Sequence, residues 1–349
     1  KLALASGAAS ATYNILTNAD FPWPTVRLSD GTEVKLDQAG YTRYRELPNR
    51  EDRKKVFDAF FGTWTKYRNS VGATLNGSIQ AQVFKAKARH YETGLASALA
   101  ANNVPDTVYR TLVQETNAAL PVMFRYYGIR KRLLKVDQLR YYDMYVPLVN
   151  SKVPFAPEAG QKLVLDAVAP LGADYVNTLA KSFNSRWVHL YPQPGKRSGA
   201  YMNPGAYDVH PYLLINYTDD YDGVSTVAHE WGHAMHSVLA NRAQPYETAD
   251  YPIFLAEIAS TTNEMLLQDY VIAHAKTPEE KLYYLNEALE LIRGTFYRQT
   301  MFAEFELKTH EAAEKGEPLT GAVFDKIYLD LLKRYFGDAQ GVVKIDDAY

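Results

Sequence analysis

Two histidines and a glutamate in the second half of the chain have a spacing that suits metal chemistry. The segment His229-Glu230-Trp231-Gly232-His233 separates the histidines by four residues. On an α-helix, residues at i and i+4 lie on one face, so both imidazoles can bind the same ion. Glu230 can then reach a metal-bound water and take its proton as the general base. The pattern therefore predicts a zinc site that activates water.

Zinc needs a third protein ligand if the fourth position is to stay open for water. Residues 254–276 read as a helix that carries Glu257 and Glu264, which are seven residues apart and share a face. One of the two can bind the metal, and the other can orient a histidine through its free ring nitrogen. Glu257 follows His233 by 24 residues, which allows a loop and a returning helix. This separation is typical of sites whose third ligand is a distant glutamate.

Two further histidines lie near this motif. His236 shares a helix face with His229, but seven residues of helix rise about 10.5 Å, too far for both rings to bind one ion. We therefore expect His236 to support or line the site. His210 precedes a predicted strand and is expected to be a groove or packing residue.

The composition narrows the class of protein. In 349 residues, 47% are hydrophobic and 22% are charged, which is ordinary for a soluble globular protein. A net charge of −2 provides no basic field for nucleic acid and no reason to expect a membrane-surface protein. Because the chain has 0 cysteines, a metal must be held by histidines and carboxylates. We expect a cytoplasmic location, with a periplasmic or secreted one as the alternative.

Hydrophobic periodicity predicts a mainly α protein with a small β element just before the metal helix. Residues 26–37 read as a hairpin around Asp30-Gly31. One helix is expected over residues 78–101, and another from Pro105 to about residue 134. A packed helix face is predicted further on, at Leu282, Leu285, Leu289, Ile292 and Phe296.

The segment before the metal helix reads as a loop followed by a strand. Residues 192–206 are dense in glycine and proline, which predicts an irregular loop. Residues 212–218, YLLINYT, are apolar and β-branched, which predicts a strand.

The sequence resembles the M3 metallopeptidases, and among them the oligoendopeptidase F type. HEWGHAMH at 229–236 and FLAEIASTTNE at 254–264 carry the resemblance. It extends to stretches far from the zinc motif, and so covers nearly the whole chain. These stretches are AKARHYETGL at 86–95, YYDMYVPL at 141–148, KRSGAY at 196–201 and PYLLINYT at 211–218.

The resemblance implies a zinc-dependent endopeptidase that hydrolyses peptide bonds in short oligopeptides. Its zinc ligands would be His229, His233 and Glu257, with Glu230 activating the zinc-bound water. Glu264 and His236 would stand behind these ligands. The implied fold is a large helical zincin-type domain, two-lobed, with a deep channel that folded proteins cannot enter.

The resemblance also implies how a substrate is held. Strand 211–218 would be the edge that aligns an extended peptide, and the backbone of Gly199 and Ala200 would line the cleft beside it. Tyr201 and His210 are the hydrogen-bond donors that we nominate for contact with substrate.

The ends of the chain carry two further expectations. Residues 1–45 would be the end of an N-terminal region, and residues 46–349 an M3-like catalytic domain. The family's catalytic tyrosine and histidine residues lie after the point that matches Tyr349, so the resemblance implies a domain truncated at its C-terminus. The sequence leaves open whether these 349 residues are active by themselves.

Two other functions compete with this hypothesis. A zinc-stabilised binding or scaffold protein would need a closed site with four protein ligands, whereas an enzyme keeps one position open. A hydrolase for substrates other than peptides would share the same motif. Comparing peptides with simple esters and amides as substrates would separate such a hydrolase from a peptidase.

Overall fold

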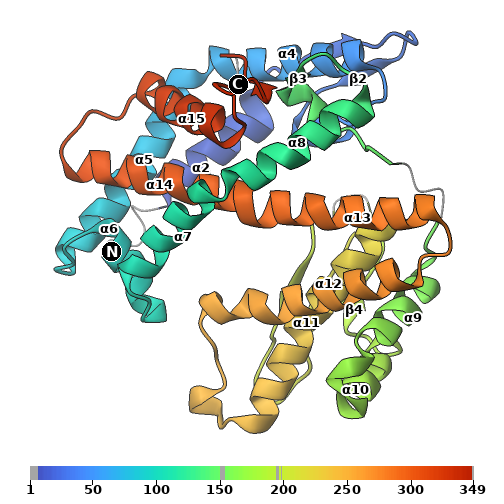
Figure 1. Cartoon of the computed structure of the whole chain (residues 1–349). Coiled ribbons are helices and arrows are strands. Elements are labelled where there is room, and N and C mark those ends of the chain that lie inside the picture. The colour runs from blue at the N-terminus through green and yellow to red at the C-terminus, as the bar shows by residue number, and fades with distance from the viewer. Residues whose placement is uncertain (1–6, 150–153, 194–195, 198, 348–349) are drawn as a thin grey trace. The chain divides into compact units, whose positions relative to one another are not determined.

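A computed structural model describes residues 7–149, 154–193, 196–197 and 199–347. The chain divides into two compact units. The first contains Lys1–Leu148 and Leu289–Tyr349, and the second contains Val149–Ala288. In the described residues helices dominate both units and every strand has three residues or fewer, so the prediction of a mainly α protein is confirmed (Figure 1). Within the described residues, no helix is both long and apolar enough to cross a membrane.

Five helices form most of the second unit. The metal motif lies on α11, which packs against α9 and against α12 (Figure 1). Asp220 caps the start of α11 by accepting a hydrogen bond from the backbone N–H of Gly223. The five helices are α9 (Pro157–Ala167), α10 (Ala173–Phe183), α11 (Tyr221–Ala243), α12 (Ile253–His274) and α13 (Pro278–Ile292), the last of which ends in the first unit.

The back of α11 is anchored in an apolar core. Trp231 and Met235 are 0% exposed, and the indole N–H of Trp231 donates to Ser182 Oγ of α10 at 2.7 Å. Helix α12 crosses α11 closely at Gly232, where an added Cβ would lie 2.6 Å from Ser260 Cα. A side chain there would push the two helices apart. Glycine at this position of the motif therefore sets the distance between the two helices that carry the candidate metal ligands.

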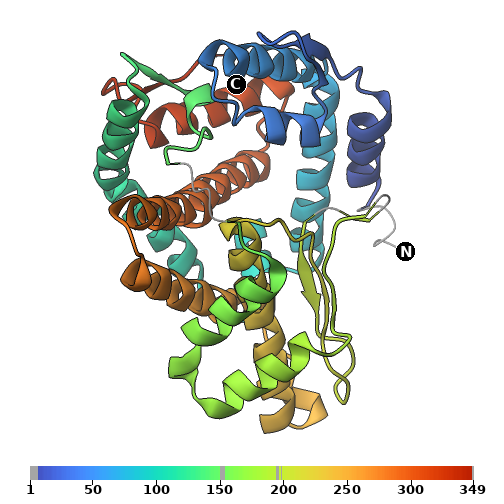
Figure 2. The same cartoon turned by 90° about the vertical axis from the view of Figure 1, so that its right-hand side faces the viewer.

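A three-stranded sheet precedes α11, and its strand order corrects two predictions. The strands are β4 (Val188–His189), β5 (Tyr201–Asn203) and β6 (Tyr212–Leu214), in the order β4-β6-β5. The yellow-green segment that contains them can be followed in Figure 2. Strand β6 confirms the strand predicted from residue 212, but it is shorter. It lies in the middle of the sheet, parallel to β4 and antiparallel to β5, so it cannot be the edge that we expected. The edge strands are β4 and β5, and β5 lies inside the segment predicted as a loop.

The first unit is also mainly helical. Strands β1 (Thr25–Arg27) and β2 (Glu33–Lys35) pair antiparallel, which confirms the predicted hairpin. Strands β3 (Leu139–Arg140) and β7 (Val343–Lys344) pair in parallel. Helices α5, α14 and α15 pack together (Figure 1). The helices of this unit are α2 (Ala8–Ile15), α3 (Gln38–Tyr44), α4 (Arg50–Lys66), α5 (Arg68–Ala88), α6 (Gly94–Leu99), α7 (Asp106–Ala118), α8 (Leu120–Leu134), α14 (Arg298–Glu314) and α15 (Gly321–Tyr335).

Two predicted helices are divided in the structure. The helix expected over residues 78–101 begins earlier, as α5, and ends at Ala88, after which His90 takes a positive φ of 61°. The helix expected from Pro105 to residue 134 breaks into α7 and α8. Pro121, in the first turn of α8, has no N–H to continue the hydrogen bonding of α7.

The prediction that residues 282–296 present a packed helix face is wrong, because the side chains of that face are exposed. The five apolar side chains that define it are between 39% and 46% exposed. Periodicity identifies an apolar stripe on a helix, but it does not say whether another element covers that stripe.

Candidate metal centre

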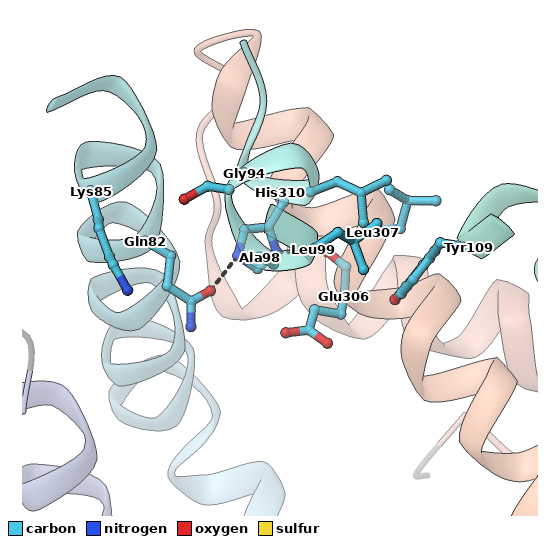
Figure 3. A pocket seen from close by; sticks show the side chains of 11 residues that line it. Gln82, Lys85, Gly94, Ala98, Leu99, Tyr109, Glu306, Leu307 and His310 are labelled. Atoms are coloured by element: carbon cyan, nitrogen blue, oxygen red, sulfur yellow. Dashed lines mark hydrogen bonds between the residues drawn. The ribbon is translucent and has the colours of Figure 1, made fainter. Parts of the chain in front are cut away.

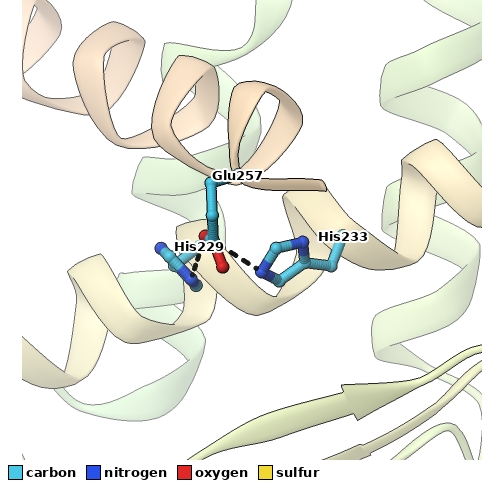
Figure 4. A group of neighbouring side chains, drawn as sticks. All are labelled: His229, His233 and Glu257. Carbon is cyan, nitrogen blue, oxygen red and sulfur yellow. Dashed lines mark ion pairs between the residues drawn. The ribbon is translucent and has the colours of Figure 1, made fainter. Parts of the chain in front are cut away.

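Two histidines of α11 and one glutamate of α12 converge in the second unit. His229 Nε2 and His233 Nε2 each lie 3.4 Å from Glu257 Oε2. One ligand atom from each of the three residues lies within 4.8 Å of the others. Figure 4 shows Glu257 reaching from α12 to the two histidine rings. This is the only such cluster of three or more histidines and carboxylates among the described residues.

The donor set and its spacing fit a zinc ion. Zinc commonly takes imidazole nitrogens and a carboxylate oxygen at about 2.0–2.2 Å in a tetrahedral arrangement. Two ligand atoms in that geometry are about 3.4 Å apart, which matches the separations of both histidines from Glu257. No lysine or arginine forms an ion pair with Glu257 in the described part of the chain, so a metal cation has no protein cation to displace.

Hydrogen bonds behind two of the three candidate ligands fix their orientation. His229 Nδ1 lies 3.1 Å from Glu264 Oε2, which leaves Nε2 free to face the metal position. The other oxygen of Glu264 accepts from Ser225 Oγ at 3.2 Å. Ser260 donates to Glu257 Oε2 at 2.8 Å.

The electrostatics at His229 follow from these neighbours. Burial acts to lower the pKa of His229, but the hydrogen bond that its ring donates to Glu264 and the surrounding carboxylates outweigh it and raise the pKa. The ring is thus held among negative charges, which also attract a cation.

Glu230 lies beside the three candidate ligands, in surroundings that suit a general base. Its side chain is 6% exposed, and Oε2 is buried with no hydrogen-bond partner among the described residues. The backbone N–H of Met202, on β5, donates to the carboxylate. Burial, reinforced by the charges of Glu257 and Glu264, raises the pKa of Glu230 to about 7. A general base works best when its pKa lies close to the operating pH.

The sequence around this site matches one known family. Residues 43–344 match the family described as peptidase family M3. The chain belongs to this family. Oligopeptidase PepF of Bacillus subtilis is 40% identical to it over 97% of this chain. Group B oligopeptidase PepB of Streptococcus agalactiae is 37% identical over 95% of this chain.

A solved structure of an M3-like fold agrees with these matches. The crystal structure of oligoendopeptidase-F from Enterococcus faecium has a TM-score of 0.73 and 32% identity, and the match covers 98% of this chain and 54% of that one. This M3 chain spans 50% of the length of the Bacillus relative and 55% of the Streptococcus relative. It therefore corresponds to about half of the proteins that it resembles.

The residues nominated for substrate contact do not all lie at the metal cavity of this M3 chain. Ala200 and Tyr201 line a cavity of about 620 Å³ that also contains His229, His233 and Glu257. Gly199 is not among the residues that line it, and its carbonyl accepts from Asn216 Nδ2 at 2.8 Å. His210 lines a different cavity and stacks on Trp187.

His236 does not reach the ligand cluster. Its ring stacks on Tyr251 at 3.8 Å between centroids, and Tyr251 lines the metal cavity. The hydroxyl of Tyr251 lies 2.8 Å from Ser237 Oγ. His236 therefore supports a wall of the cavity.

Sequence reasoning missed several residues of this M3 site. Ser260 lies three residues after Glu257, and Ser225 four residues before His229, so helical spacing could have identified both. No comparable signal exists for Met202, Tyr207 or Tyr251, which loops and the edge strand bring to the cavity.

A cavity in the first unit lacks this chemistry. It measures about 270 Å³ and is lined by residues that include Lys85, Tyr109 and Glu306 (Figure 3). Both ring nitrogens of His310 are engaged there. Nδ1 lies 2.8 Å from the carbonyl oxygen of Glu306, and Nε2 lies 2.5 Å from Gln82 Oε1. His310 is therefore held as a packing residue.

Proposed function

We propose that this chain is the metal-binding part of a zinc endopeptidase that hydrolyses short oligopeptides. The observation that carries the proposal is the convergence of His229, His233 and Glu257 on one point beside a buried, unpaired Glu230 oxygen. Membership of peptidase family M3 and the oligopeptidase names of its relatives support it. In this proposal residues 1–45 end an N-terminal region, and residues 46–349 belong to the catalytic domain.

The mechanism assigns one task to each group. When bound, zinc would act as a Lewis acid toward a water molecule and the scissile carbonyl. Glu230 takes a proton from the attacking water and later delivers it to the leaving amine nitrogen. Glu264 holds His229 in the tautomer that presents Nε2. Ser260 limits the rotation of the Glu257 carboxylate.

The position of strand β5 is consistent with the proposal that the chain binds extended peptides. Strand β5 lies at one edge of its sheet, and in the described residues its outer side pairs with no further strand. Ala200, Tyr201 and Met202 all line the metal cavity, which keeps a peptide on this edge close to Glu230. An extended backbone is needed for such pairing, so unfolded short peptides are the expected substrates.

The proposal is tested by separating metal content from hydrolysis. The wild-type chain should hold one zinc ion, measured by mass spectrometry of the metal after dialysis. His233→Ala should lose the ion, because one of three ligands is removed. Glu230→Gln should keep the ion and lower the rate of peptide hydrolysis about 10²–10⁴-fold, the usual contribution of a general base. Hydrolysis is followed by the masses of the products from a peptide library.

Three outcomes would overturn the proposal. Zinc content that is unchanged in His233→Ala would remove the ligand assignment. Near-normal hydrolysis by Glu230→Gln would remove the general base. A zinc-loaded chain that cleaves simple esters but no peptide would favour a different hydrolase. Exposed Glu247 lies in the same unit, and Glu247→Gln serves as the control that should change neither quantity.

A further inference from the structure

A second cavity adjoins the metal cavity in the second unit. It measures about 580 Å³ and is lined by α10, by the loop after β5 and by the end of α11. Tyr207 and Asn241 line both cavities. The two spaces are therefore neighbours that share a wall. The proposed metal mechanism uses none of the remaining residues of the second cavity.

Three aromatic rings lie in a column at this cavity. Trp187 and His210 are stacked almost parallel, with centroids 4.9 Å apart and an interplanar angle of 5°. Tyr212 continues the column, 4.6 Å from His210 and tilted by 47°. The carbonyl of Trp187 accepts from the backbone N–H of Leu213 at 2.7 Å, which ties the indole to the central strand. The column is thus a preformed platform for another ring.

The shared wall is also held in place. The hydroxyl of Tyr207 donates to the carbonyl of Gln244 at 2.6 Å, at the end of α11. The ring of Tyr207 meets Tyr246 edge-on at 5.7 Å. These contacts join the loop after β5 to the end of α11 and hold the wall that the two cavities share.

The charges around the second cavity do not select an ion. Lys181 and Arg242 are balanced in part by Asp208, which also lines the cavity. Arg242 is paired with Asp174 at 3.3 Å. Val209 is 44% exposed at the rim. An apolar or aromatic side chain therefore fits the platform better than a charged group.

The direction of β5 indicates which part of a peptide would arrive here. The chain runs from Tyr201 through Asn203 to Tyr207, that is, from the metal cavity to the shared wall. Antiparallel strand pairs outnumber parallel ones about two- to three-fold. A peptide paired antiparallel to β5 sends its amino-terminal residues along the same path, toward Tyr207 and Trp187.

The length of helix α11 gives the distance between the metal cavity and the second cavity. From Glu230, which lines the metal cavity, to Val238, which lines only the second cavity, there are eight residues, or about 12 Å of helix. An extended peptide covers about 3.3 Å per residue. The second cavity therefore lies about four residues from the scissile bond.

We propose that the cavity lined by Trp187, His210 and Val238 binds an aromatic side chain about four residues on the amino-terminal side of the scissile bond. The inference rests on the proposed peptidase function and adds a determinant of specificity to it. Trp187 forms the platform, His210 supports it from behind, and Val238 is part of the lining from α11.

The test compares peptides that share a scissile sequence and differ upstream. One series ends two residues before the scissile bond, and another extends five residues with Phe or Gly at the fourth. Binding is measured by anisotropy of labelled peptides on the zinc-loaded Glu230→Gln chain, which should not consume them. The Phe peptide should bind roughly three- to ten-fold more tightly than the Gly peptide, as expected for one ring stacked on another.

Variants assign this preference to the platform. Trp187→Ala should remove the difference between the Phe and Gly peptides and leave the short peptides unaffected, whereas Trp187→Phe should keep most of it. Tyr191→Ala is the matched control, because Tyr191 is 54% exposed in the same unit and lines neither cavity. Retained zinc content in each variant verifies that the metal site is folded.

A direct signal comes from tryptophan fluorescence. The chain has four tryptophans, Trp23, Trp64, Trp187 and Trp231. A peptide with 4-nitrophenylalanine at the fourth upstream position should quench the wild-type emission and not that of Trp187→Phe. Equal quenching in both would overturn the proposal.

The remaining outcomes separate this inference from the proposed function. If short peptides bind and are cleaved but Phe and Gly peptides bind equally, the second cavity is not a subsite and the peptidase function stands. If the preference depends on residues after the scissile bond, the direction is wrong and the proposal fails. If no peptide binds to the zinc-loaded chain, both proposals are overturned.

Discussion

Asp143 in the first unit and Glu230 in the second are both buried carboxylates, yet their surroundings differ. Asp143 is 0% exposed and lies 2.8 Å from an Arg50 nitrogen and 3.0 Å from an Arg53 nitrogen. Burial acts to raise the pKa of Asp143, but hydrogen bonds from the two arginines outweigh it and lower the pKa. Glu290 and Glu304 in the same unit are also paired with arginines, and their pKa values are lowered too.

Glu230 has no such partner. Among the described residues no lysine or arginine forms an ion pair with Glu230, Glu257 or Glu264, and the pKa of Glu230 is raised to about 7. Burying a charge without a partner lowers stability. The first unit uses its carboxylates to hold helices together, whereas the second keeps a cluster of carboxylates open for a cation. Four substitutions test this contrast.

The largest effect is expected at Asp143. Asp143→Asn leaves Arg53, whose side chain is 3% exposed, without its carboxylate. Breaking a buried pair in this way typically costs about 3–5 kcal/mol. Hydrogen exchange of peptides from the first unit measures the loss. Asp58→Asn is the control, because Asp58 forms an exposed pair with Lys54 and should cost about 1 kcal/mol or less. Equal losses in the two variants would contradict the contrast.

Glu264 comes next, because it acts on the metal through His229. Glu264→Ala should weaken zinc binding about 10–100-fold, the usual effect of losing a group that orients a metal-binding histidine. Glu264→Gln keeps an acceptor for His229 Nδ1 and should fall between Ala and wild type. Competition with a chelator of known affinity measures both. Unchanged zinc affinity in Glu264→Ala would show that the hydrogen bond to His229 does not support the ligand.

Replacing Glu230 should change the free energy of unfolding in the opposite direction to replacing Asp143. In the metal-free protein, Glu230→Gln should raise the free energy of unfolding at pH 8 by about 1–2 kcal/mol, because it removes an unpaired buried charge. The folded pKa of about 7 lies above the ordinary value of 4.5, so this penalty grows as pH rises between the two. At pH 4 the carboxyl is protonated and the variant should match wild type. A destabilised variant at pH 8 would contradict this account.

The smallest effect concerns acid stability of the first unit. Because the folded pKa of Glu304 lies below its ordinary value of 4.5, its contribution is present above that value and is lost as pH falls through the folded pKa. Denaturant unfolding of wild type between pH 5 and 3 should therefore lose stability. In Glu304→Gln the slope in that window should be smaller by up to about 1.4 kcal/mol per pH unit, one proton's share. Identical slopes would mean that Glu304 does not stabilise the fold by its charge.

The metal motif could be predicted because its geometry is local. His229 and His233 share a face on any helix, and Glu257 and Glu264 do so in the same way. The structure brings three of these side chains to one point. The hairpin at residues 25–35 was also predictable, because the tight turn that joins its two strands depends on residues that are neighbours in the sequence.

Helix ends and helix exposure were less predictable. The apolar pattern of α5 continues past the end of that helix, where His90 takes a positive φ, and the pattern of α7 continues into α8, where Pro121 lacks an N–H. Hydrophobic periodicity alone does not reveal either break. The apolar stripe of residues 282–296 has the correct helical spacing and is nevertheless exposed. Burial depends on which other element packs on a helix, and that information is not local.

The sequence by itself determined the candidate metal ligands, the candidate general base and the mainly α class, because each follows from the spacing of residues within individual helices. Only the tertiary structure decided that β5 rather than β6 is the edge strand beside the site. It also brought Met202 to Glu230 and placed Trp187 against His210. Strand order and ring stacking join residues far apart in the chain, and such contacts are set by long-range packing that no local pattern encodes.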